Sequence, residues 1–208
     1  MTATLSVDLA PGPIERTRAE VAVVTFFEDE RPLRGNAGRA DWRLCGRLSH
    51  LISDDRVQGR RGEAVLIPTR GGMQASLLVA IGLGPRDGFG DRDWEAASRD
   101  AIDRVLKLGA SVVALPLCEA ETDDRVLDGR AQALLRGAGA ALADAGGELQ
   151  LRVVAPGPET RRAAEALRRT DARGFPVSVA LDLPTAASRP RAGSSEGPAV
   201  RLHSGPDS

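Results

Sequence analysis

Hydrophobic residues along this chain alternate between short continuous runs and longer stretches in which apolar positions recur every three or four residues. The continuous runs are rich in β-branched and aromatic residues, which is typical of buried strands, whereas the three- and four-residue spacing is typical of amphipathic helices. The run EVAVVTFF is the clearest example of the first kind. The predicted strands are 20–27, 63–67, 75–81, 111–117, 149–154 and 177–183, and the predicted helices are 41–52, 91–108, 124–145 and 158–169.

The order of these elements predicts an α/β fold. Helices separate most of the strands, and such alternation is typical of a mixed β-sheet flanked by helices on both faces. The strands 63–67 and 75–81 are separated only by a short loop with two glycines, so we expect them to form an antiparallel hairpin. Asp41 is the expected N-cap of the helix 41–52. Gly137 and Gly139 interrupt the helix 124–145, where small residues permit a close approach to a sheet or a partner helix.

The chain is expected to form one domain between two flexible ends. Residues 1–18 are expected to be a flexible N-terminal lead, because Pro11, Gly12 and Pro13 oppose regular structure. Residues 19–183 are long enough for a single layered core. Residues 184–208 are rich in Pro, Gly and Ser and are expected to be a disordered tail. We see no signal peptide and no run long enough to cross a bilayer, so a cytoplasmic location is expected.

The charge balance excludes some classes of function. The 208 residues include 28 Lys and Arg against 29 Asp and Glu, which gives a net charge of −1. A dedicated nucleic-acid binder or a protein held to acidic membranes needs clustered positive potential. Paired arginines have acidic residues close by in the sequence, so mixed-charge solvated faces are expected there; the pairs are Arg60-Arg61, Arg161-Arg162 and Arg168-Arg169. Lys107 is the only lysine, which limits lysine-based chemistry to one residue.

Thiol chemistry is not expected. Cys45 and Cys118 form no Cys-x-x-Cys pair, and both are expected to be buried in a reduced protein. His50 lies five residues after Cys45, which on a helix turns it away from the thiol. Trp42 and Trp94 occupy positions that the helical pattern directs inward, so both are expected in the core.

The succession of motifs along the chain is specific. A strand ending in Phe26-Phe27 is followed by Gly59-Arg60-Arg61-Gly62-Glu63, by Gly82-Leu83-Gly84 after a strand, and by Leu106-Lys107-Leu108-Gly109 at the end of a helix. This succession resembles the N-terminal domain of the cytosolic leucyl aminopeptidase family over about residues 19–183. In that family the matching motifs are F-x-G-K-x-G-E, V-G-L-G-K and L-K-x-x-G. Arg60 and Pro85 stand where the family usually has lysines.

The resemblance implies a macro-domain-like three-layer sandwich and places peptidase chemistry outside these residues. In the family, two metal ions are held in a second, C-terminal domain, which we expect to be absent here. The stretch 170–174 matches part of the family's metal motif, but Arg173 replaces the ligand glutamate and would repel a cation. We therefore expect a non-catalytic homologue, with no metal site and no cofactor.

One loop is a candidate anion or ligand site. Gly82, Gly84, Gly88 and Gly90 lie between a predicted strand and a predicted helix, where backbone N–H groups and a helix N-terminus can bind a phosphate. Asp87 stands where the third glycine of G-x-G-x-x-G would fall, and Asp91 and Asp93 bring negative charge. A tight glycine turn without a ligand is the competing interpretation.

These observations give several hypotheses for function. The first is a stand-alone protein-interaction or assembly module that associates with itself or with a full-length aminopeptidase. The alternative is a macro-like domain that binds or processes a nucleotide-derived ligand such as ADP-ribose. Residual aminopeptidase activity is not expected, since the metal ligands are missing. An aminopeptidase-associated DNA-binding role, which some bacterial members of the family have, is the weakest hypothesis, since no aromatic residues interleave with the arginines. A membrane partner is not expected.

Overall fold

The computed structural model describes residues 3–117, 124–157 and 159–183. Seven strands and five α-helices follow one another in these ranges, together with one short 3-10 helix, η1. The predicted tail 184–208 and Cys118 lie outside the described residues. The strands are β1 (Thr4–Ala10), β2 (Val21–Phe26), β3 (Ala64–Pro68), β4 (Leu77–Gly82), β5 (Val112–Pro116), β6 (Glu148–Val154) and β7 (Ser178–Asp182), and the helices are η1 (Ile14–Arg16), α1 (Gly35–Arg43), α2 (Arg47–Ser53), α3 (Asp91–Lys107), α4 (Asp124–Ala145) and α5 (Glu159–Arg169).

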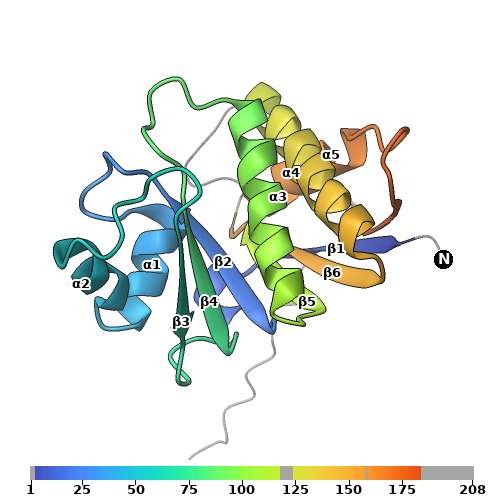
Figure 1. Ribbon diagram of the computed structural model, residues 1–208. Coiled ribbons are helices and arrows are strands. Elements are labelled where there is room, and N and C mark those ends of the chain that lie inside the picture. Colours follow the sequence, from blue (N-terminus) through green and yellow to red (C-terminus); the bar gives the residue numbers. More distant parts are fainter. Residues whose placement is uncertain (1–2, 118–123, 158, 184–208) are drawn as a thin grey trace, which may run out of the picture.

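The strands form one mixed sheet in the order β3-β4-β2-β5-β6-β1-β7. Every neighbouring pair is parallel except β3 and β4, which form the predicted antiparallel hairpin. Helices α3, α4 and α5 pack on one face of the sheet, and α1 and α2 pack on the other (Figure 1). The prediction of an α/β fold with helices on both faces is confirmed.

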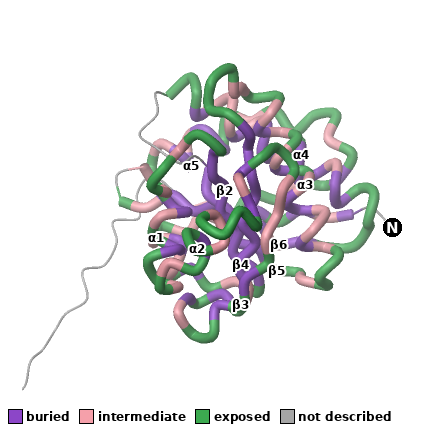
Figure 2. The backbone as a smooth tube through the Cα atoms, turned by 60° about the vertical axis from the view of Figure 1, so that its left-hand side comes forward, coloured by how far each residue is buried: buried purple, intermediate pink, exposed green. Residues whose placement is uncertain are grey.

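Strand β2 lies between the two layers of helices, and all six of its residues are buried (Figure 2). Its sequence VAVVTF is almost continuously apolar, as expected for a parallel strand covered on both faces. Val21 and Val23 belong to the core under α3 and α4, whereas Val24 and Phe26 belong to the core under α1 and α2. One strand therefore contributes to both cores.

The prediction of a flexible lead over 1–18 is wrong for β1. This strand lies inside the sheet, paired in parallel with β6 on one side and β7 on the other. Leu5 and Val7 are buried in the core, while Ser6 on the opposite face is exposed, which is the alternation of a strand with one buried face. The Pro11-Gly12-Pro13 segment ends this strand and does not prevent it.

The predicted helix 41–52 is two helices. Cys45 and Gly46 have left-handed backbone angles (φ of 56° and 75°), which break the helix between α1 and α2. Asp41 lies within α1, and its carboxylate accepts hydrogen bonds from the N–H groups of Leu48 (2.7 Å) and Ser49 (3.1 Å). Asp41 therefore caps a helix, as predicted, but the helix that it caps is the following one.

The break changes where two side chains point. Trp42 is 77% exposed, so the prediction that it belongs to the core is wrong, and Cys45 is also exposed. Trp94 on α3 is buried, as predicted. The helical spacing that directs Trp42 inward applies only to a continuous helix, and here the chain turns three residues later.

Helices α3 and α4 pack closely because α4 carries glycine at the contact. A Cβ atom on Gly137 would overlap the carbonyl oxygen of Glu95 and would lie 2.9 Å from the backbone nitrogen of Arg99. A Cβ on Gly139 would lie 3.3 Å from a methyl group of Val177, which is a side chain and can adjust. Only Gly137 therefore has a backbone reason to be glycine.

We predict that Gly137→Ala lowers the free energy of unfolding by about 2 kcal/mol, because the added methyl group forces α3 and α4 apart. The matched substitution Gly139→Ala should leave stability unchanged or raise it by up to about 1 kcal/mol, since alanine is the better helix former. Urea unfolding followed by circular dichroism measures both. Equal effects of the two substitutions would contradict the packing that we describe.

Candidate functional site

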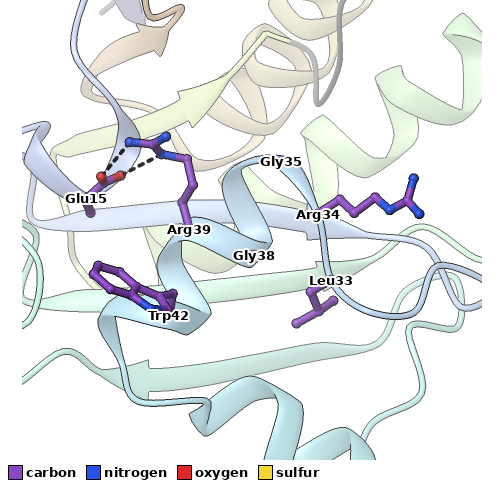
Figure 3. A pocket seen from close by; sticks show the side chains of 7 residues that line it. All are labelled: Glu15, Leu33, Arg34, Gly35, Gly38, Arg39 and Trp42. Carbon is purple, nitrogen blue, oxygen red and sulfur yellow. Dashed lines mark hydrogen bonds and ion pairs between the residues drawn. The ribbon is translucent and has the colours of Figure 1, made fainter.

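Helix α1 borders an open hollow of about 450 Å³ on the surface of the protein. We call this surface the α1 hollow; its lining residues are Glu15, Leu33, Arg34, Gly35, Gly38, Arg39 and Trp42 (Figure 3). Glu15 comes from η1, and Leu33 and Arg34 come from the segment that enters α1. The size is within the range of ligand pockets in proteins, which is about 300–1,000 Å³.

The spacing of residues on α1 produces this surface. Gly35, Gly38, Arg39 and Trp42 follow the i, i+3, i+4, i+7 spacing of one helix face and share the outer face of the helix. The opposite face of the helix, which includes Ala37 and Ala40, is buried in the core. The two glycines leave the middle of the outer face without side chains, so that Trp42 and the arginines project beyond it.

Gly38 is fixed by its surroundings. A Cβ atom at this position would lie 2.6 Å from the carbonyl oxygen of Leu33. The segment before α1 therefore passes directly against the helix.

An ion pair forms one wall of the α1 hollow. The guanidinium of Arg39 donates to the carboxylate of Glu15 at 2.8 and 3.3 Å (Figure 3). The side chain of Glu15 is 10% exposed and that of Arg39 is 53% exposed. Burial would raise the pKa of Glu15, but the hydrogen bond and the charge of Arg39 outweigh it and hold that pKa below its usual value.

Arg34 and Trp42 are the unpaired groups of this surface. Within the described ranges the side chain of Arg34 forms no hydrogen bond or ion pair, and it points away from the Glu15–Arg39 pair (Figure 3). Trp42 lies near the Glu15–Arg39 pair in the same view. Residues with no structural role for their polar or aromatic groups are candidates for binding.

The candidate loop 82–90 is arranged differently from a phosphate-binding loop. Its N–H groups mostly donate within the protein, to carbonyl oxygens or to carboxylates. The donors, with their acceptors, are Gly82 (Glu63, 2.8 Å), Leu83 (Phe26, 3.0 Å), Gly84 (Gly59, 2.8 Å), Arg86 (Asp29 carboxylate, 3.1 Å), Phe89 (Arg86, 3.2 Å) and Gly90 (Asp93 carboxylate, 2.9 Å). A phosphate would have to compete with these acceptors.

Three of the four glycines of this loop, Gly82, Gly84 and Gly88, have structural reasons. A Cβ on Gly82 would overlap the carbonyl oxygen of Arg60 and lie 2.6 Å from the carbonyl carbon of Gly59. Gly84 and Gly88 have left-handed angles (φ of 78° and 73°), which glycine adopts without strain. Gly90 precedes α3 in an extended conformation.

The segment 59–63 locks onto this loop. One carboxylate oxygen of Glu63 accepts hydrogen bonds from the N–H groups of Gln58, Gly59 and Arg60 at 2.8–3.0 Å. Burial would raise the pKa of Glu63, but these three donors outweigh it and lower that pKa. Because Gly82 and Gly84 donate to the carbonyl oxygens of Glu63 and Gly59, the two motifs that the sequence singles out, 59–63 and 82–84, lie against each other.

A stack of aromatic rings and arginines fixes the far side of the loop. The rings of Phe27 and Phe89 meet edge to face at 5.1 Å. Arg86 lies over Phe27 at 4.4 Å, and Arg130 of α4 lies over Phe89 at 4.8 Å and over Trp94 at 5.6 Å. The sequence did not single out Phe89 or Arg130, because contacts between α4 and the loop have no signature along the chain. The loop 82–90 is held from both sides.

The described part of the chain contains no group of three or more His, Cys, Asp or Glu side chains placed to hold a metal ion. In the stretch 170–174, the carboxylate of Asp171 is paired with Arg173 at 3.0 Å. His50 contacts the carbonyl oxygen of Gly46 at 2.7 Å through Nδ1. No helix among the described residues is long and apolar enough to cross a membrane.

The paired arginines lie in mixed-charge surroundings, as predicted. Arg61 pairs with Asp93 at 2.5 Å, Arg161 with Glu165 at 2.9 Å, and Arg169 with Asp128 at 2.7 Å. These ion pairs leave little unbalanced positive charge for nucleic acid at those positions.

Comparisons with known proteins give the family and the fold. The family model described as the N-terminal domain of the cytosol aminopeptidase family matches residues 23–143. The chain is 32% identical over 126 residues to a probable cytosol aminopeptidase of Azoarcus sp. (strain BH72), and 23% identical over 135 residues to one of Sulfurihydrogenibium sp. (strain YO3AOP1). These alignments cover 59% and 64% of this chain but 24% and 27% of the relatives. The chain thus spans about a quarter of their length.

Solved structures show a similar fold at low identity. A mutant of tomato leucine aminopeptidase superposes with a TM-score of 0.54 and 16% identity, covering 78% of this chain and 35% of that chain. The macrodomain of Oceanobacillus iheyensis superposes with a TM-score of 0.58 and 12% identity, covering 76% of this chain and 87% of that chain. The macro-domain-like fold that the resemblance implied is confirmed.

The family model covers more than half of the chain, from β2 into α4, and it includes both interlocked motifs at 59–63 and 82–84. The described residues supply no metal cluster of the kind that peptidase chemistry needs. This chain belongs to the cytosol aminopeptidase family, and the part of it that matches is the family's N-terminal domain.

Proposed function

We propose that this chain works as a cytoplasmic protein-interaction or assembly module and that the α1 hollow is its binding face. The partner is a second copy of this chain or a full-length aminopeptidase of the family. The match to the N-terminal domain of the cytosol aminopeptidase family supports this proposal, because that domain is one part of the longer relatives.

The exposure of Trp42 is the observation that carries the proposal. A tryptophan is rarely left 77% exposed on the surface of a domain that has no use for it, since its large apolar area gains most from burial. Tryptophan and arginine are also the residues most enriched among those that dominate the binding energy at interfaces. Both residue types line the α1 hollow.

We also propose that the described domain has no peptidase activity of its own. Hydrolysis by two metal ions needs several anionic or neutral ligands converging on the cations. The candidate stretch 170–174 places an arginine beside its only carboxylate. We therefore propose a binding role separate from catalysis.

We favour the α1 hollow as the binding site over a nucleotide site in the loop 82–90. Most N–H groups of that loop already donate to carbonyl oxygens or to the carboxylates of Asp29 and Asp93. The side chain of Asp93 also occupies the first turn of α3, where a phosphate would otherwise gain from the helix dipole.

We predict that Trp42→Ala weakens self-association or association with a full-length family member by about thirtyfold, the loss that corresponds to about 2 kcal/mol. Light scattering after size exclusion measures the first, and calorimetric titration measures the second. Leu66→Ala is the matched control, since it also removes an exposed apolar side chain (48% exposed) and should have no effect. A strictly monomeric chain that binds no family aminopeptidase would overturn the proposal.

A second prediction concerns activity. The purified chain with added zinc or manganese should release no leucine from leucine amide above the rate of a buffer control. A full-length aminopeptidase of the family, assayed in parallel, shows that the conditions support hydrolysis. Metal-dependent turnover by this chain that survives repurification would show that the non-catalytic assignment is wrong.

A third prediction concerns nucleotides. ADP-ribose at millimolar concentration should leave the Tm unchanged. A ligand at 100 times its dissociation constant would stabilise the fold by about 2.7 kcal/mol, a shift of several degrees. A clear rise in Tm that disappears in Gly88→Asp would restore the loop 82–90 as a ligand site.

A further inference from the structure

We propose that the α1 hollow binds an acidic segment of a partner protein, with an apolar side chain of that segment on the ring of Trp42 and its carboxylates at Arg34 and Arg39. This inference rests on the proposed interaction function and adds the chemistry of the partner. The experiment below separates the two, because it varies the charge of the partner while keeping its apolar residue.

The charges on α1 are unequal. The helix and its N-cap residue carry three arginines, Arg34, Arg39 and Arg43, against one carboxylate, that of Asp41. Asp41 is buried, and its carboxylate accepts from the N–H groups that begin α2 and from the hydroxyl of Ser49. Its charge is thus directed into the protein, and the outer face of α1 is positive.

The carboxylate that lines the hollow, that of Glu15, is already neutralised. Glu15 is nine-tenths buried and takes two hydrogen bonds from Arg39. A guanidinium has five N–H donors, and only those on Nε and one terminal nitrogen are used here. Arg39 therefore has donors left for a second carboxylate, while Glu15 holds the guanidinium in place.

The amino end of α1 also favours an acidic ligand. The structure shows no side-chain cap on this helix, and no acidic residue lies in its first turn. The end of a helix that lacks an acidic cap carries partial positive charge, and it lies beside Arg34. Elsewhere the chain does supply such residues, since Asp91 and Asp93 lie in the first turn of α3.

The dimensions suit a short extended peptide. From Gly35 to Trp42 the helix rises by seven steps, which is about 10 Å at 1.5 Å per residue. An extended chain covers that length with about three residues, at ~3.3 Å each. The order along the helix is Arg34, Arg39 and Trp42, so a segment with acidic residues next to an apolar one can reach the arginines and the ring of Trp42 together.

A protein segment fits this surface better than a nucleic acid does. Single-stranded nucleic acids bind along a series of aromatic platforms, whereas the α1 hollow has the single ring of Trp42.

The test uses three fluorescein-labelled pentapeptides with one central leucine, flanked by Glu and Asp, by Gln and Asn, or by Lys and Arg. Anisotropy measures binding to the full chain. We expect the acidic peptide to bind at least tenfold more tightly than the neutral one at 25 mM salt, with the difference shrinking to about twofold at 500 mM. The basic peptide should bind more weakly than the neutral one.

Matched variants locate the site. Arg34→Glu should weaken binding of the acidic peptide about tenfold, whereas Arg92→Glu, which makes the same charge change on α3 on the other side of the sheet, should not. Trp42→Phe should retain most of the binding and Trp42→Ala should lose it. The emission of Trp42 should shift to the blue on binding, and this shift should be absent in Trp42→Phe, where only the buried Trp94 remains.

Each contrary result has a definite meaning. Equal binding of acidic and neutral peptides, both abolished by Trp42→Ala, would overturn the acidic partner and leave the interaction function standing. Tighter binding of an unstructured DNA strand than of the acidic peptide would also overturn it, in favour of nucleic acid. No binding of the acidic peptide at 1 mM would overturn it as well, and the association measurement with Trp42→Ala then decides the interaction function separately.

Discussion

The burial of β2 on both faces of the sheet is the constraint on which the rest of the structure depends. Alternate residues of this strand enter the core under α3 and α4 and the core under α1 and α2, so neither layer of helices can be displaced without exposing it. The end of β2 anchors the neighbouring loops as well. The carbonyl oxygen of Phe26 accepts from Leu83, and the ring of Phe27 packs against Phe89. The loops at this edge are consequently filled by their own contacts.

This arrangement divides the surface into a closed part and an open part. At the end of β2 and β4, the backbone groups of 82–84 and 59–63 bond to each other, and carboxylates of Asp29 and Asp93 accept from further N–H groups of 82–90. On the outer face of α1, by contrast, an indole ring and the guanidinium of Arg34 have no counterpart among the described residues. The free energy that binding can release is therefore concentrated on α1, because Trp42 is the most exposed large apolar side chain among the described residues (77%).

The sequence was sufficient for elements whose signal is local. Period and composition located β2, the β3–β4 hairpin, α3, α4 and α5 to within a few residues. It was insufficient where a distant contact decides the outcome. Whether Thr4–Ala10 pairs as a strand depends on β6 and β7, more than a hundred residues away along the chain. Trp42 follows the helical pattern, but the left-handed turn at Cys45 and Gly46, held by Asp41, ends that pattern and leaves the ring outside. The glycines of 82–90 suggested a ligand site, but only the structure shows that the backbone of Arg60 fills the space beside Gly82 and that Asp93 accepts from the N–H of Gly90.

The close contact between Gly82 and the segment 59–63 limits what a resemblance to a family shows about function. Both stretches lie within the residues that match the family's N-terminal domain, and their shapes fit each other: the peptide groups at 59–60 lie where a side chain on Gly82 would be. Replacing either partner would disturb the contact between these two loops whatever the domain does. Residues of this kind therefore record the architecture of a domain, and its partners and chemistry can differ while they stay the same.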